Sequence, residues 1–516
     1  MRTDGPHIAV IGGGATGCGV ARDLALRGCR VTLVETGDLG CGTSSRFHGM
    51  LQSGARYAVS DWRYAAECMR DRRIVARLAP EAVEETGGLF VNLDSDPSDY
   101  ADRFVAGCRR AEIPVEELDP DRVMADEPAI SRRVRRAFAV PDATIQPWRY
   151  LNLLADDVRR RGGTILTRHC VTSARRTAGR VAALTVEGDG ASREIAVDAV
   201  VNAAGPWSGA IARLLDAEVP LELTKGSILV FAHRLVSRAI NRCRPPSSHD
   251  IMVPTGTVSL FGTTSQVVDD PAATSVSPAE VQALLDGAEP LIPNIRSYRA
   301  LRAWAGVRPL VRPENWPAGQ ALSRRHAVID HAAQGLMGAF TVCGGSFTSH
   351  RTMAADTADH VCRLFGINEP SRAAETPLAR AGGAAFWRPS SSYEQVESSG
   401  RYAQLLCECE NVPYDAVDRC VGDAGLRSLN DLRRRLRVGF GPCQGTFCGA
   451  RLASIVAAAG GHGHDELERF WAERIKGAAL TGWGANARQL MLGDLVCRET
   501  LGLALRPSVD PRVDSK

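Results

Sequence analysis

The sequence predicts an α/β protein in which an inserted, largely antiparallel domain interrupts a parallel sheet, with a small α-rich domain at the C-terminal end. The main observation is a succession of strand, glycine-rich turn, helix and strand within residues 7–35. Segment 198–207 is a buried strand that ends in a small-residue turn, and 343–346 is a further glycine-rich turn before a helix. Four cysteines gathered in the last third of the chain indicate a separate C-terminal domain.

Length and composition describe an ordinary globular protein of two or three domains. The chain has 516 residues, of which 44% are hydrophobic, enough for a substantial core. The net charge of +3 is small and evenly spread, which argues against a nucleic-acid partner. The sequence has no run of 18 apolar residues to span a membrane, and its first residues lack the pattern of a signal peptide. We therefore expect a cytoplasmic protein whose contact with the inner membrane, where it exists, is peripheral and made through a partner subunit.

The N-terminal segment has the pattern of a dinucleotide-binding βαβ unit. His7–Ile11 is a short apolar strand, residues 18–27 carry apolar positions at helical spacing, and Arg30–Glu35 is a second strand. The sequence Gly-Gly-Gly-Ala-Thr-Gly between the first strand and the helix is a GxGxxG motif in its required context. Glu35, at the end of the second strand, is placed to accept a hydrogen bond from a ribose hydroxyl. This context makes an otherwise weak motif specific for a dinucleotide.

Each position of the motif has a physical role. Gly12 allows the tight turn after the strand, Gly14 lets the backbone approach a pyrophosphate, and Gly17 lets the helix pack closely on the strand. The pyrophosphate is expected at the N-terminus of the helix, beside Ala15 and Thr16, because the free N–H groups and the helix dipole favour an anion there.

Two further turns favour FAD over NAD as the dinucleotide. A buried strand leads into Ala204 and Gly205, whose backbone is expected near the cofactor. Gly344 and Gly345 precede a helix that starts near Thr348, and the N–H groups of this turn are expected to face the electron-rich end of a flavin ring. Such split returns fit a flavin fold with a second domain inserted between pieces of the dinucleotide domain. The remaining expected FAD contacts are Ser44, Ser45 and Val171.

The four clustered cysteines form a CxC…CxxxxC pattern: Cys407, Cys409, Cys443 and Cys448. In an extended segment the first two side chains lie about 6–7 Å apart, close enough to share one centre. The second pair lies in a Gly-Pro-Cys-Gln-Gly loop, where bare backbone can donate N–H bonds to sulfur. Four thiolates are the ligand set of a [2Fe–2S] cluster. Zinc and four unrelated structural thiols are the alternatives, although zinc sites more often use CxxC pairs.

These motifs divide the chain into parts with different roles. The expected parts are an FAD-dependent oxidoreductase domain at 1–365, a linker rich in Ala, Pro, Ser and Glu at 366–400, a [2Fe–2S]-binding domain at 401–461 and a helical tail at 462–516. Within the first part we expect FAD-binding pieces at about 1–50, 151–218 and 331–365, and substrate-domain pieces at about 51–150 and 219–330. The clearest predicted elements there are helices Trp62–Leu78, Asp99–Ala111, Pro147–Arg161 and Pro278–Leu285 and strands Ser227–Phe231, Val258–Gly262 and Ala303–Val307.

Several ordered segments resemble a known family. Together with the four cysteines they are Ile11–Gly17, Ser53–Tyr57, Gly88–Phe90, Val201–Gly205, Asn241–Arg244, Asp250–Pro254, Gly262–Ser265 and Gly306–Leu310. Over nearly its whole length the chain resembles the A subunits of anaerobic, respiratory glycerol-3-phosphate dehydrogenases. The resemblance implies an FAD-binding, Rossmann-like domain of the glutathione-reductase or amino-acid-oxidase type and a C-terminal domain like bacterioferritin-associated ferredoxins. It also implies oxidation of sn-glycerol 3-phosphate to dihydroxyacetone phosphate by hydride transfer to flavin N5, with electrons leaving through the cluster to partner subunits and quinone.

The resemblance also assigns the substrate site. Arg308 matches the family's substrate-binding arginine, and Arg56 and Tyr57 match its Arg-Tyr pair. A guanidinium suits this role because its planar donors bind a phosphate or carboxylate in bidentate fashion. Arg308 is therefore expected to act in both substrate binding and catalysis.

Three positions depart from the family pattern. Family members commonly carry a lysine where this chain has Ser346, a tyrosine where it has His350, and a histidine where it has Gln52. The lost lysine removes a cation that would help to hold a phosphate dianion. His350 and the nearby His48 become the candidate general bases, because an imidazole titrates near neutral pH.

Two alternative functions stay open. In one, the same machinery oxidises another small anionic hydroxy acid or amino acid, which suits a pocket without the lysine. In the other, the protein is an electron-transfer subunit that oxidises no substrate of its own; the intact Arg308, Arg56 and Tyr57 argue against this.

Overall fold

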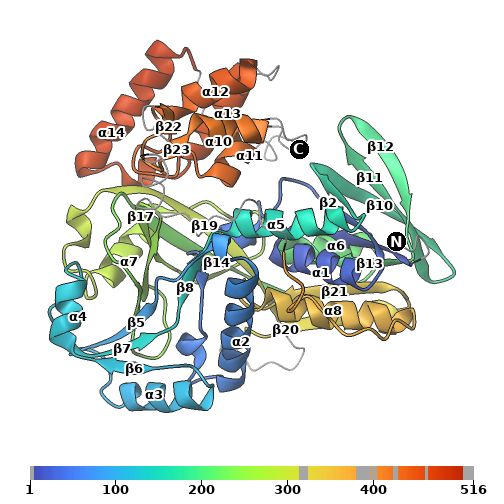
Figure 1. The fold of residues 1–516 in the computed structure, drawn as a ribbon, viewed down its shortest axis with the longest axis horizontal. Coiled ribbons are helices and arrows are strands. Elements are labelled where there is room, and N and C mark those ends of the chain that lie inside the picture. The colour runs from blue at the N-terminus through green and yellow to red at the C-terminus, as the bar shows by residue number, and fades with distance from the viewer. Residues whose placement is uncertain are drawn as a thin grey trace.

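The computed structural model describes residues 5–312, 324–378, 397, 404–421, 428–458 and 463–503. Figure 1 shows a parallel sheet with its helices, a second sheet system beside it, and an α-rich C-terminal part that lies against both. None of the helices in these ranges is long and apolar enough to cross a membrane.

A six-stranded sheet forms the centre of the first part, in the order β20-β21-β13-β1-β2-β9. Its strands are β1 (His7–Ile11), β2 (Arg30–Glu35), β9 (Thr164–Thr167), β13 (Ala199–Asn202), β20 (His326–Asp330) and β21 (Ala339–Gly344). All neighbours pair in parallel except the edge strand β20, which is antiparallel to β21. The prediction that segments near 200 and 343 return to the N-terminal sheet is therefore confirmed.

Alternating side chains of β1 supply both faces of this sheet. The helices involved are α1 (Ala15–Leu26), α5 (Pro147–Arg160), α6 (Ser208–Leu214) and α8 (His350–Leu364). Ile8 and Val10 pack with α1, α5 and α8, whereas Ala9 and Ile11 pack with α6 on the other face. That second face is completed by a three-stranded antiparallel sheet, which the sequence did not predict: β10 (His169–Thr177), β11 (Arg180–Gly188) and β12 (Ala191–Ala196).

A nine-stranded sheet joins two distant parts of the chain, 88–140 and 221–311. Its strands are β5 (Gly88–Leu93), β6 (Glu116–Leu118), β7 (Val134–Val140), β14 (Leu221–Phe231), β15 (Ala239–Arg242), β16 (Ile251–Thr255), β17 (Val258–Gly262), β18 (Gln266–Val268) and β19 (Ala300–Val311). Every pair is antiparallel except β15 with β5. A small sheet of β3 (Met50–Leu51), β8 (Ala143–Ile145) and β4 (Val83–Glu84) lies near it. The largely antiparallel character expected of these segments is found.

Helices cover both faces of the nine-stranded sheet. They are α2 (Trp62–Leu78), α3 (Tyr100–Arg110), α4 (Pro120–Asp126) and α7 (Pro278–Ala288). α4 and α7 enclose one core, and α2 and α3 enclose another. The predicted bounds of α2 and β17 are met to the residue, while two predicted strands are parts of the longer β14 and β19. The domain boundaries themselves stay a prediction.

The C-terminal part is mainly helical and has a core of its own. Its elements are β22 (Leu405–Cys407), β23 (Val412–Pro413), α10 (Tyr414–Val421), α11 (Leu429–Leu436), α12 (Cys448–Ala458), α13 (Gly463–Ile475) and α14 (Gly484–Leu495), followed by a π-helical turn, Val496–Thr500. The predicted linker 366–400 lies mostly outside the described residues. Its first stretch packs on α1, because Arg22 donates from Nη1 to the Ala373 carbonyl at 2.8 Å and from Nη2 to the Thr376 carbonyl at 2.6 Å.

Candidate active site

The glycine turn after β1 is a backbone surface with no room for side chains. Gly12 has φ +111°, and a Cβ there would lie 2.5 Å from the Ala203 carbonyl oxygen. A Cβ on Gly17 would lie 1.9 Å from the Gly12 carbonyl oxygen, so only glycine lets α1 approach the strand this closely. The turn therefore leads into the N-terminus of α1, where Gly14, Ala15 and Thr16 line a cavity.

Two polar side chains fix the loops around this turn. Glu35 accepts hydrogen bonds from Gly13 N–H at 2.7 Å through Oε2 and from Gly37 N–H at 2.8 Å through Oε1. The Ser44 hydroxyl accepts from Ala15 N–H at 2.9 Å. Both side chains also line the cavity, and Glu35 accepts a third bond from the Thr36 hydroxyl at 3.2 Å. A carboxylate has about four acceptor sites, which leaves capacity for a ribose hydroxyl.

A single cavity of about 2000 Å³ runs from the glycine turn to the nine-stranded sheet, which is larger than most small-molecule sites. Most of the predicted cofactor residues line it: Gly12, Gly14, Ala15, Thr16, Glu35, Ser44, Val171, Ala204, Gly205, Gly344, Gly345 and Thr348. Gly17 serves the helix–strand contact instead, and Ser45 is not among the lining residues. The glycine cradle, the helix N-terminus and the size of the cavity fit FAD.

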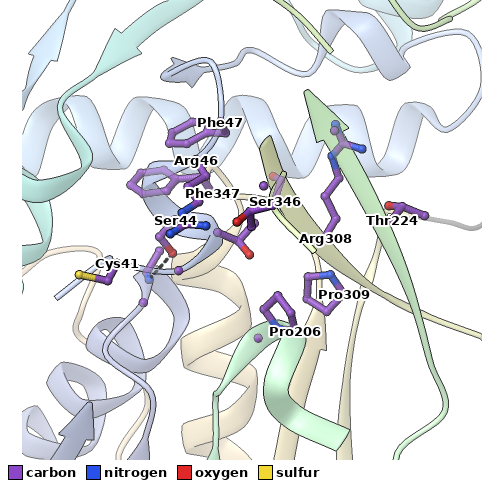
Figure 2. A pocket seen from close by; sticks show the side chains of 18 of the residues that line it. Cys41, Ser44, Arg46, Phe47, Pro206, Thr224, Arg308, Pro309, Ser346 and Phe347 are labelled. Atoms are coloured by element: carbon purple, nitrogen blue, oxygen red, sulfur yellow. Dashed lines mark hydrogen bonds between the residues drawn. The ribbon is translucent and has the colours of Figure 1, made fainter. Parts of the chain in front are cut away.

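The far end of the cavity is cationic, because Arg56, Arg308 and Arg324 line it. Arg308 lies on β19 and donates from Nη2 to Thr263 Oγ1 at 2.6 Å, while its Nη1 is buried without a protein partner. A Cβ on Gly226 of the paired strand would lie 2.0 Å from Nη2, so the glycine makes room for the guanidinium. Burial, together with the charges of Arg324 and Arg56, lowers the Arg308 pKa to about 10, so the side chain stays charged at neutral pH. Figure 2 shows Arg308 across the pocket from Cys41, with Ser346 between Arg308 and Ser44.

The other predicted substrate residues lie at the same end. Arg56 donates to the Ser247 carbonyl at 2.6 Å and lies 3.4 Å from a carboxylate oxygen of Asp250. Tyr57 lines the cavity beside it. Arg324 was missed by sequence reasoning, because nothing in its neighbourhood distinguishes it from a surface arginine. It lines the cavity, and its charge acts on Arg308.

His48 lies in this cationic end. Its Nδ1 accepts a hydrogen bond from Met50 N–H at 3.3 Å. Burial, and then the charges of Arg56, Arg308 and Arg324, lowers its pKa to about 3. The ring is therefore neutral at pH 7 without a ligand, and an anion bound among the three arginines would offset their effect.

His350 does not reach the cavity, which corrects its prediction as a candidate base. It begins α8 but turns into the core, where its Nδ1 donates to the Phe347 carbonyl at 2.7 Å and its Nε2 lies 3.0 Å from the Tyr150 hydroxyl. Burial lowers its pKa to about 4. With both ring nitrogens engaged inside the protein, His350 holds the start of α8 rather than a substrate.

The other two departures from the family pattern do line the cavity. The Ser346 hydroxyl lines the cavity and lies 3.3 Å from that of the buried Ser349, so this position contributes no charge to the cavity. The backbone N–H of Gln52 donates to Thr348 Oγ1 at 3.2 Å, which ties the loop before Arg56 to the late glycine turn. Arg46, also unpredicted, lines the cavity on the side of Ser44 (Figure 2).

The four predicted cysteines meet at one place in the C-terminal part. The Cys407 thiol contacts that of Cys448, and the Cys443 thiol contacts those of Cys409 and Cys448. A Cβ on Gly441 would lie 2.4 Å from the Cys409 Cβ, so the loop can wrap this closely only with glycine. In the described ranges, no three or more His, Cys, Asp or Glu side chains surround a point as ligands of one metal ion.

Backbone N–H groups point at the sulfurs. Those of Gly439 and Glu410 face Cys407, and those of Gly445 and Phe447 face Cys443. Such N–H bonds stabilise thiolate sulfur in iron–sulfur sites. Four adjoining thiols with backbone donors fit a [2Fe–2S] cluster.

Comparison with known proteins agrees with both sites. The family model of FAD dependent oxidoreductases matches residues 7–360, and that of the BFD-like [2Fe-2S] binding domain matches 405–458. The chain is 38% identical to the A subunit of the anaerobic glycerol-3-phosphate dehydrogenase of Escherichia coli K12, an alignment that covers 93% of this chain and 94% of the relative. The chain belongs to the family of anaerobic glycerol-3-phosphate dehydrogenase A subunits. It is an FAD-dependent oxidoreductase with a [2Fe–2S] domain.

Other members and neighbours extend the likeness. The A1 subunit of the Haloferax volcanii enzyme is 34% identical over 96% of this chain and 90% of its own length. The structure of glycerol-3-phosphate dehydrogenase from Bacillus halodurans complexed with FAD superimposes with a TM-score of 0.63 at 20% identity, covering 98% of this chain and 97% of that one. At this identity the likeness concerns the fold, which is the predicted FAD-binding type.

Proposed function

We propose that this protein oxidises sn-glycerol 3-phosphate to dihydroxyacetone phosphate and passes the electrons through its cluster to a partner. The observation that carries the proposal is the cationic end of the FAD-sized cavity, where the buried Nη1 of Arg308 has no protein partner. A buried charged donor left without an acceptor is costly, so the site is built for an anion. The names of the relatives supply the identity of that anion.

Three guanidiniums contribute to binding the substrate phosphate. Arg308 presents a fixed donor, because its other nitrogen is held by Thr263. Arg324 and Arg56 add charge from two other segments of the chain, so the phosphate is met from several sides. Guanidinium–phosphate hydrogen bonds are charge-assisted and about twice as strong as neutral ones. Held in this way, the substrate has its secondary alcohol directed into the rest of the cavity.

Oxidation requires a hydride acceptor and a proton acceptor. FAD, when bound along the glycine cradle, supplies the hydride acceptor at its N5 atom. We assign the proton to His48, the one imidazole at this end of the cavity among the described residues. The phosphate charge offsets the three arginines that lower the His48 pKa, so substrate binding raises that pKa toward the range in which an imidazole accepts a proton.

Electrons leave through the four-cysteine site to another protein. Phe447 lies directly before Cys448 and is 52% exposed, so one side of the cluster loop faces solvent, where an acceptor can approach. The relatives are named as subunits, which supports the existence of further electron-transfer subunits. Peripheral attachment to the inner membrane would follow from such a partner.

A second candidate is oxidation of another small anionic hydroxy acid or amino acid. It is favoured by Ser346, which contributes no charge where family members commonly carry a lysine. A carboxylate or a monoanion needs fewer cations than a phosphate dianion, and the three arginines suffice for either.

Anaerobic absorbance of the purified protein separates these candidates. Adding sn-glycerol 3-phosphate is expected to bleach the flavin band and part of the cluster absorbance. A flavin that stays oxidised with this substrate but bleaches with dithionite would overturn the assignment. Bleaching by a 2-hydroxy acid or an amino acid in place of sn-glycerol 3-phosphate would establish the second candidate.

A further inference from the structure

The loop that carries Cys443 is enclosed by arginines from two parts of the molecule. Arg299, just before β19, donates from Nη2 to the carbonyl oxygen of Pro442, the residue next to Cys443. Arg474, at the end of α13, donates to the side-chain oxygen of Gln444, on the other side of that cysteine. The two guanidiniums thus flank one cluster ligand, one from the part that holds the nine-stranded sheet and one from the C-terminal part.

Neither cation is neutralised by the protein. Within the described residues, no carboxylate oxygen lies within 4.0 Å of Arg299 or Arg474, and the Nε atom of each is buried without a hydrogen-bond partner. Arg474 is only 4% exposed. Its nearest charged neighbours include two more buried arginines, Arg302 and Arg433, and a single carboxylate, Glu473, which lies 4.0 Å from Arg433.

This excess of buried positive charge has a physical cost. An uncompensated buried charge is destabilising by several kcal/mol, and like charges in one region add to the cost. An anion beside the cations removes that cost. The four thiolates of the cysteine site are the anionic group adjacent to both Arg299 and Arg474, and a [2Fe–2S] cluster held by four thiolates carries net negative charge that grows by one when an electron is added.

We propose that Arg299 and Arg474 set the reduction potential of the cluster, by stabilising the extra negative charge of its reduced state. Opposite charges interact more strongly in a buried site than in water, so both arginines favour the reduced over the oxidised state. The potential is thereby raised, and electrons flow from the flavin side toward the cluster. Because Arg299 reaches the loop from the nine-stranded sheet, contact between that sheet and the C-terminal part is itself a condition of this potential. The proposal depends on the cluster but not on the identity of the substrate.

The test is a redox titration of the purified holoprotein with dithionite and mediators, followed by the spectrum of the reduced cluster. In Arg299→Gln, the ratio of reduced to oxidised cluster at a given potential is expected to fall about tenfold, which corresponds to a shift of about 59 mV to lower potential for one electron. Arg474→Lys keeps the charge and is expected to retain the potential, whereas Arg474→Gln is expected to lower it. The iron and sulfide content of each variant is measured in parallel.

Arg419→Gln is the matched control. Arg419 belongs to the same C-terminal part but is 70% exposed and paired with Asp415, so its loss is expected to leave the potential unchanged. An unchanged potential in a cluster-loaded Arg299→Gln protein would overturn the proposal. An equal shift in the Arg419 variant would overturn it as well, since the effect would then reflect net charge alone. If Arg474→Gln purifies without its cluster, the cluster potentials of Arg299→Gln and Arg474→Lys decide the outcome. No arm uses sn-glycerol 3-phosphate, so a wrong substrate assignment leaves the outcome intact.

Discussion

The two cofactor sites of this molecule are built from different materials. The dinucleotide site is made of bare backbone: glycines bring carbonyl and N–H groups close, and Glu35 and Ser44 hold the loops in place. The cluster site is made of side chains, with four thiols surrounded by buried arginines. Backbone sites tolerate no added atoms, whereas side-chain sites are sensitive to charge. We therefore expect an added side chain to impair the dinucleotide site most, and a change of charge to impair the cluster site most.

The strongest test of the backbone site is a single added side chain. In Gly17→Val the new Cβ atom would lie 1.9 Å from the Gly12 carbonyl oxygen. This clash forces α1 away from β1. We expect a protein that retains no FAD, measured as the absence of flavin absorbance after purification. Gly209→Ala in α6 is the control, because the atom nearest to its Cβ position, Arg213 Nη1, is 3.7 Å away. A Gly17→Val protein that purifies with full FAD would contradict the close packing of α1 on β1.

The cluster site should respond to loss of one thiol without harm to the flavin. Cys443→Ser removes the thiol that contacts both Cys409 and Cys448. We expect loss of iron and sulfide and loss of electron delivery to an external acceptor, while substrate still bleaches the flavin. Cys420→Ser, in the same part of the chain but outside the four-cysteine set, is the control. Loss of flavin bleaching with FAD still bound would show that the two sites are not separable.

Removal of a positive charge at the substrate end is expected to lower the activity strongly without abolishing it. Arg308→Ala removes a buried charged donor, worth about 2–3 kcal/mol, so kcat/KM for sn-glycerol 3-phosphate should fall about 100-fold. Arg312→Ala is a control from the same strand end, since Arg312 is half-exposed and pairs with Glu222 at 2.7 Å. Steady-state kinetics with an artificial acceptor measure both. Unaltered kinetics in Arg308→Ala would remove this residue from the site.

The smallest expected effect concerns pH and His350. The pKa of the His350 ring is about 4 in the folded protein, below the ordinary value of 6.5. Between these two pH values the ring is protonated in the unfolded chain but neutral in the native protein. Stability is therefore lost as pH falls from 6.5 toward 4, by about 2 kcal/mol between pH 7 and pH 5. His350→Gln should weaken this dependence, read as a smaller fall of the thermal unfolding midpoint between those pH values. Equal falls in both proteins would show that the ring is protonated in the native state.

The parts of the fold that sequence predicts well are local. The first βαβ unit spans residues 7–35, and each of its elements has a signal within a few residues: an apolar run, a glycine turn, a terminal acid. The four cysteines are likewise visible, because their spacing is itself the signal. α2 and β17 were placed correctly because their ends coincide with capping or turn residues, as when Asp61 accepts from Tyr64 N–H.

The parts that sequence did not predict depend on long-range packing. Arg324 belongs to the substrate end only because the chain returns there from a distant segment. Of the two histidines predicted as candidate bases, His48 lies at the cavity, whereas the first turn of α8 directs His350 into the core against Tyr150. The start of the expected linker proved to be packed, because the Arg22 side chain binds carbonyls that composition does not reveal. For His350 and Arg22 the deciding partner lies more than 100 residues away.

The cavity wall has a consequence for how the protein is made. Glu473, Lys476 and Ala479, from the C-terminal part, line the same cavity as the glycine turn of β1. A chain is synthesised from its N-terminus, so the sheet that receives FAD can form before these last residues leave the ribosome. The C-terminal residues would then be the last to join the cavity wall. The residues that line this cavity therefore bear on the order in which the protein assembles, as well as on its final architecture.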